Sequence, residues 1–333
     1  MKRKFPYSSK TDISYLGEEP WSFDEIRKAY FDDFTAVEEY IYSRLDGKKI
    51  ESQLDQLQLT FEIFSNSVDE LLASIELFKS YEDRGKNWKN GNNSIINFVE
   101  MNIQRGIYSS CALAMALVDH YRKLDKFLSI VGYSDKRNEV FSKSQTHAFI
   151  QSLRNYSLHS KITPVNWNIT YNFQDRRKEI SFILSKEKLL EWDGWSNDLK
   201  IFIKDSLRGI DVEVFFKEYA KKAETLYEWY RNSAIDQHIE KYRKYLFYKN
   251  YIEGLKQYYS VNLAVSTAVN NKVSNPYTYI EKYLTSKQFD VINALPRHSV
   301  EQVEQLIAFV DTYNMCDDNF RNNLYKLFSV KAK

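Results

Sequence analysis

The chain has 333 residues, of which 43% are hydrophobic and 28% are charged, close to ordinary usage in globular proteins. This composition favours neither a disordered nor a membrane protein, and the net charge of +2 argues against coating of nucleic acid by bulk charge. Two cysteines exclude a disulfide framework, and no run reaches the roughly 18 apolar residues of a membrane span. We therefore expect a reduced, cytoplasmic protein with no membrane partner.

The first part of the chain predicts long helices, because only nine Gly and five Pro interrupt the whole sequence. Ser22 and Glu25 have the spacing of a capping box and predict a helix from there to Gly47. Apolar residues at helical spacing predict two more helices, over 51–81 and from 94 to about 130. The second of these is the strongest candidate for a central core helix.

Residues 145–163 predict a helix with two different faces. Phe149, Leu153 and Tyr156 have the i, i+4, i+7 spacing of a buried face. The side away from that face carries polar residues, namely Gln151, Arg154, Asn155 and His159. Leu158 is apolar but lies among them, which indicates that another protein surface covers it.

The pattern changes after Pro164. Alternating apolar and polar residues predict two strands, and residues 174–177 the turn between them, so a β-hairpin is inserted at about 165–185. Short helices are expected around 186–192 and 197–207, followed by one very long helix from Asp211 to about Tyr258. Three helices, at about 277–293, 299–313 and 317–330, complete a small C-terminal extension.

These elements predict a mainly α fold, an antiparallel helical bundle of long helices with one inserted hairpin. We expect residues 1–93 to form N-terminal helices that pack on a core, residues 94–258 to form that core, and residues 259–333 to form the C-terminal extension.

Several enzyme signatures are absent from the sequence. It contains no glycine-rich phosphate loop, no dinucleotide fingerprint, no His-Glu-x-x-His pair and no Gly-x-Ser-x-Gly elbow. No metal-ligand spacing is present, and we expect neither a metal nor a cofactor. Four of the five histidines have no distinctive setting, so structural or surface roles are expected for His120, His147, His238 and His298.

The fifth histidine belongs to a recognisable arrangement. Arg154, Asn155 and His159 together resemble the R-x4-H motif of the HEPN superfamily, in which many helical domains are metal-independent ribonucleases. The helical context of residues 94–258 resembles that family as well. The resemblance implies a HEPN-like bundle in which His159 acts as general acid/base, Arg154 binds the scissile phosphate and Asn155 orients the imidazole or the phosphate.

The resemblance also implies a reaction and partners. The ribose 2′-OH would attack the adjacent phosphate and leave a 2′,3′-cyclic phosphate, as in an endoribonuclease that serves as a toxin or phage-defence effector. One motif supplies one histidine, and Arg154 and His159 lie about 140° apart on an ideal helix. Family members solve this by pairing two copies, so we expect a homodimer with a composite active site. An antitoxin or regulatory protein is a further expected partner, although the tyrosine that some members carry two residues after the histidine is Lys161 here.

Local charge is compatible with RNA as the substrate. Residues 121–161 contain eight basic and three acidic residues, and the candidate RNA-binding residues among them are Arg137, Lys143 and Lys161. An ordinary basic helix surface explains the same pattern. Two other functions stay open from the sequence: a non-catalytic HEPN-like module that binds RNA or protein, and a purely structural helical protein.

Overall fold

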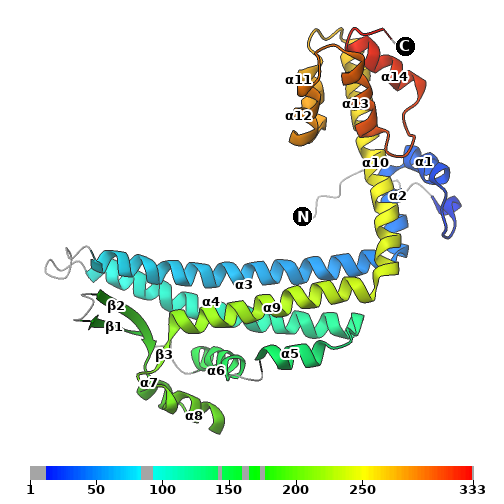
Figure 1. Ribbon diagram of the computed structural model, residues 1–333. Helices are drawn as coiled ribbons and strands as arrows, with labels where there is room; N and C mark the ends of the chain where they lie inside the picture. The colour runs from blue at the N-terminus through cyan, green and yellow to red at the C-terminus, as the bar shows by residue number, and fades with distance from the viewer. Residues whose placement is uncertain (1–12, 84–92, 142–144, 160–164, 173–176, 332–333) are drawn as a thin grey trace, which may run out of the picture. The chain divides into compact units, whose positions relative to one another are not determined.

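The computed structural model describes residues 13–83, 93–141, 145–159, 165–172 and 177–331 (Figure 1). The described chain is mainly helical with one small antiparallel sheet, which confirms the predicted mainly α class with an inserted hairpin. The HEPN-like arrangement of the helices stays a prediction. None of the described helices is both long enough and apolar enough to cross a membrane.

The chain separates into two compact units. The middle unit is Ile50–Ile239, and the terminal unit combines Met1–Lys49 with Glu240–Lys333. The three-part division expected from the sequence, with boundaries after residues 93 and 258, remains a prediction.

Three long helices form the framework of the middle unit: α3 (Asp46–Asp83), α4 (Asn93–Leu128) and α9 (Val212–Gln237) (Figure 1). The predictions over 51–81 and 94–130 are confirmed. Helix α4 buries Ile103 and Ile107 completely, and the Ser110 hydroxyl lies 3.1 Å from the Ser67 hydroxyl of α3. Helix α9 packs on both other helices through aromatic pairs, since Phe61 stacks on Tyr227 at 4.4 Å and Tyr121 meets Tyr230 edge-on at 5.2 Å.

A three-stranded antiparallel sheet, in the order β1-β2-β3, lies in the same unit. Strands β1 (Val165–Asn172) and β2 (Arg177–Leu184) form the predicted hairpin, in a register that pairs Trp167 with Phe182. The predicted turn falls largely outside the described residues. Strand β3 (Ile210–Asp211) pairs with the end of β2 and was not predicted, because two residues are too few to show an alternating pattern.

Four shorter helices complete the middle unit: α5 (Tyr133–Phe141), α6 (Thr146–His159), α7 (Lys186–Leu190) and α8 (Asn197–Asp205). Gly132 has φ 84° and separates α4 from α5, as expected for a glycine that ends a helix. Helix α6 contacts both α4 and α9, and α5 contacts α9.

Three predicted continuous helices are broken in the structure, at Asp33, at His238 and at Leu284. The helix expected from Ser22 to Gly47 is two helices, α1 (Phe23–Asp32) and α2 (Phe34–Arg44). Ser22 and Glu25 form the predicted capping box, but Asp33 is extended and its carboxylate accepts hydrogen bonds from the first turn of α2. An aspartate that caps a new helix thus overrides the continuous apolar spacing.

The helix expected from Asp211 to Tyr258 is likewise interrupted. His238 leaves the helical conformation, with φ −117° and ψ 25°, and separates α9 from α10 (Ile239–Asn270). Its Nε2 lies 3.1 Å from the carbonyl oxygen of Leu128 at the end of α4. This tertiary hydrogen bond is made by the residue at which the helix is broken. No local pattern of residues indicates the break.

The core of the terminal unit is built on α10. Tyr251 of this helix stacks on Phe23 at 3.9 Å and donates a hydrogen bond to the Phe23 carbonyl. Around it lie the C-terminal helices α11 (Tyr277–Ile280), α12 (Ser286–Ala294), α13 (Val300–Val310) and α14 (Asp318–Leu327), with the 3-10 turn η2 (Glu281–Tyr283) after α11. The helix expected over 277–293 is therefore divided, because Leu284 is extended and Thr285 opens a new capping box.

In the middle unit, Gly209 packs closely against the end of β2, and this close approach can be tested by substitution. It has φ 117°, and a Cβ built on it would lie 2.2 Å from the carbonyl oxygen of Leu184. We expect Gly209→Ala to lower the free energy of unfolding by about 1–3 kcal/mol, since backbone strain and a clash act together. Gly17→Ala is the matched control, because Gly17 also has positive φ but nothing lies within 4 Å of an added Cβ. Thermal unfolding followed by circular dichroism measures both, and equal stability of the two variants would contradict the expectation.

Candidate functional site

Helix α6 carries the motif residues, and its buried face is held by aromatic side chains. Phe149 and Leu153 are fully buried and Tyr156 nearly so, which confirms the predicted inner face. Phe149 stacks on Trp195 at 5.4 Å, and Tyr156 meets Trp192 edge-on at 5.5 Å. Both tryptophans lie in the connection between α7 and α8, after the hairpin. This aromatic packing fixes the rotation of α6 about its axis.

The opposite face of α6 presents the motif. Arg154 and Asn155 are half-buried, and Gln151 is exposed one turn earlier. Within the described part of the chain, no hydrogen bond or ion pair holds the Arg154 guanidinium. Leu158, expected to be covered by another surface, is 44% exposed in the single chain. The face therefore combines a half-buried guanidinium with an accessible apolar side chain.

The remaining predicted site residues are placed to different extents. His159 is the last residue of α6, one turn beyond Asn155. The structure describes its backbone but not its side chain. Lys143 and Lys161 fall outside the described residues. Arg137 is exposed on α5, with its guanidinium carbon 6.0 Å from the centre of the Tyr133 ring.

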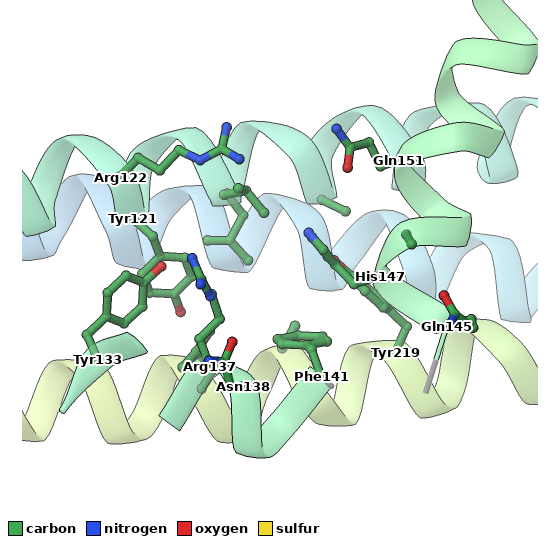
Figure 2. A pocket seen from close by; sticks show the side chains of 16 residues that line it. Tyr121, Arg122, Tyr133, Arg137, Asn138, Phe141, Gln145, His147, Gln151 and Tyr219 are labelled. Carbon is green, nitrogen blue, oxygen red and sulfur yellow. The ribbon is translucent and has the colours of Figure 1, made fainter. Parts of the chain in front are cut away.

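A cavity of about 430 Å³ lies beside this helix, with walls from α4, α5, α6 and α9 (Figure 2). Gln151 and His147 of α6 line it together with Arg137 of α5, so one predicted RNA-binding residue shares a cavity with the helix of the motif. Arg122 of α4 and Tyr219 of α9 are also part of the lining. The sequence did not indicate this cavity, because residues that are far apart in the chain form its walls.

His147 has a more specific setting than the sequence indicated. Its Nδ1 lies 3.0 Å from the Tyr219 hydroxyl, and the two rings are stacked with centres 6.1 Å apart. Burial lowers the pKa of His147, and the positive charges of Arg122 and Arg137 lower it further. At neutral pH the imidazole is therefore mainly uncharged. The sequence could not indicate this contact, because Tyr219 of α9 lies 72 positions from His147 in the chain.

The other three histidines have hydrogen bonds of the structural kind. His120 Nδ1 lies 2.6 Å from the Thr60 hydroxyl between α4 and α3. In the terminal unit, His298 Nδ1 lies 2.9 Å from the backbone carbonyl oxygen of Phe328. With the helix-terminal hydrogen bond of His238, these contacts are those of side chains that stabilise packing.

Comparisons with family models, with curated proteins and with solved structures give no significant match to this chain. The class of protein is therefore defined by the fold itself, a mainly helical chain with a small antiparallel sheet.

Proposed function

We propose that the protein is a metal-independent endoribonuclease of the HEPN type, active as a homodimer in which two copies of α6 form one site. The observation that carries the proposal is the arrangement Arg154-Asn155-x3-His159 at the end of a single helix. Support comes from the aromatic packing of the opposite face of α6, because that packing holds the helix that carries the motif in one orientation.

The chemistry requires a base, an acid and a group that binds phosphate. His159 of one copy removes the proton from the ribose 2′-OH, and the 2′-oxygen forms a bond to phosphorus. The bond from phosphorus to the 5′-oxygen breaks, and the histidine of the second copy protonates that leaving group. Arg154 binds the phosphate oxygens through its planar fork and offsets the charge that develops on them. A cyclic 2′,3′-phosphate and a free 5′-hydroxyl result.

Cleavage in the absence of metal tests this function. We expect the purified full chain to cut single-stranded RNA in excess EDTA and to leave 2′,3′-cyclic phosphate ends, detected by mass spectrometry of the fragments. The matched substrate has 2′-O-methyl groups throughout and should resist cleavage, because the attacking hydroxyl is blocked. Products with 3′-hydroxyl ends, or cleavage that requires an added divalent cation, would contradict the proposal. RNA that is bound but never cut would instead favour a non-catalytic module.

A further inference from the structure

The cavity beside α6 has an internal chemistry of its own. Part of its lining is apolar and buried, with Ala114 and Leu117 from α4 and Ala223 and Leu226 from α9. Its volume of about 430 Å³ falls in the range of small-molecule sites. All four helices that form it belong to the middle unit.

Aromatic rings line both ends of the cavity (Figure 2). At one end, Phe141 lies 5.3 Å from the His147 ring and 5.6 Å from the Tyr219 ring. At the other end, Tyr121 and Tyr133 are stacked with centres 5.9 Å apart. Flat rings of this kind favour a planar ligand that can stack or pack edge-on against them.

Positive charge enters the cavity from two helices. Arg122 extends from α4 and Arg137 from α5, and no carboxylate is found among the described residues of the lining (Figure 2). Arg122 pairs at 3.2 Å with Asp119, but both side chains are largely exposed, so this ion pair is weak and readily exchanged. Burial lowers the pKa of His147 most, and the charges of Arg122 and Arg137 lower it further.

One lining residue has a buried polar atom that lacks a partner among the described residues. Tyr121 is 3% exposed, and its hydroxyl has no hydrogen bond to any described residue. An unsatisfied buried hydroxyl is costly, at about 1–3 kcal/mol. A ligand with an oxygen acceptor near Tyr121 would satisfy it. Asn138, Gln145 and Gln151 add amide groups that can donate to and accept from a heterocycle.

We propose that this cavity binds a small organic phosphate whose phosphate group is joined to a planar ring, for which a nucleoside monophosphate is the simplest form. Arg122 and Arg137 hold the phosphate, because guanidinium groups pair with phosphate oxygens through two parallel hydrogen bonds. The ring lies against Phe141 and His147. The site is separate from the proposed catalytic residues and does not depend on ribonuclease activity.

Isothermal titration calorimetry of the full chain tests the proposal, with AMP, GMP, CMP and UMP as separate probes. At least one is expected to bind, and the matching nucleoside and inorganic phosphate, tested alone, should each bind at least about tenfold more weakly, since each lacks one half of the recognised chemistry. Absence of binding by all four at about 1 mM would overturn the proposal. So would binding of the nucleoside as tight as that of the nucleotide.

Variants connect binding to the named residues. Arg122→Gln and Arg137→Gln change exposed side chains, so both should fold, and each should weaken nucleotide binding about tenfold or more. Arg105→Gln is the matched control, because Arg105 is an exposed arginine on α4 outside the cavity lining. Tyr121→Phe should leave the free protein at least as stable while it weakens binding. Unchanged affinity in both arginine variants would overturn the assignment.

The two proposed sites can fail separately. Arg154→Ala and His159→Ala should bind the nucleotide like the unmodified protein, even though they are expected to lose RNA cleavage. A protein that binds nucleotide but never cuts RNA would overturn the proposed function alone. A protein that cuts RNA but binds no nucleotide would overturn this inference alone.

Discussion

His159→Ala is expected to reduce the rate of RNA cleavage by about 100-fold to 10,000-fold, because the general acid/base of the reaction is lost. Arg154→Ala is expected to reduce it by about 100-fold to 1,000-fold, the typical cost of one group that stabilises transition-state charge. Single-turnover cleavage of an end-labelled RNA in EDTA measures both rates. Arg154→Lys keeps the charge but not the planar fork, so its rate should lie between those of Arg154→Ala and the unmodified chain.

Controls separate catalysis from folding. Arg105→Ala removes an exposed arginine from α4 and should leave cleavage unchanged, which shows that loss of positive charge alone is not responsible. Circular dichroism of each variant should match that of the unmodified protein, because Arg154 lies on the outer face of α6 and the buried face is untouched. Full activity in both Arg154→Ala and His159→Ala would end the ribonuclease assignment.

The second large effect concerns assembly. We expect Leu158→Asp to weaken self-association by about 100-fold or more. Burial of one leucine contributes roughly 1.5–3 kcal/mol, a symmetric interface buries it twice, and 1.4 kcal/mol corresponds to a factor of ten. RNA cleavage at low protein concentration should fall in parallel, because each copy supplies half of the proposed site. Sedimentation over a range of protein concentrations measures the dissociation constant.

A leucine elsewhere on the middle unit provides the matched control for this variant. Leu207 is 93% exposed, and Leu207→Asp introduces the same charge on the same unit. We expect this variant to dimerise and cleave RNA like the unmodified protein. An active protein that sediments as a monomer would contradict the composite site, whatever the effect of Leu158→Asp.

Much of the secondary structure could be predicted because its signals are local. The apolar spacing of α4, the alternation in β1 and β2 and the capping box at Ser22 depend on residues close together in the chain. The breaks at Asp33 and His238 could not be predicted in the same way. At His238 the apolar spacing continues, and the hydrogen bond to Leu128 joins residues 110 positions apart.

The same difference between local signals and tertiary packing applies to the two candidate sites. Arg154, Asn155 and the inner face of α6 follow from helical spacing alone, so their placement on one helix was predictable. The cavity was not, because it needs Tyr219 of α9 against His147 of α6 and two arginines from different helices. His147 was assigned an ordinary role for this reason. A single residue type gives no information about the neighbours that tertiary packing brings to it.

The discontinuity of the terminal unit has a consequence for the order of folding during synthesis. Ile26 and Val37, near the N-terminus, are buried in the same cluster as Tyr251 and Phe320 of α10 and α14. Both leave the ribosome well before the residues that cover them, and their unit cannot complete its core until those residues follow. The whole of Ile50–Ile239 emerges in between and can fold before the terminal unit closes. In a growing chain, residues 13–49 therefore remain without their native neighbours until the whole middle unit has been made.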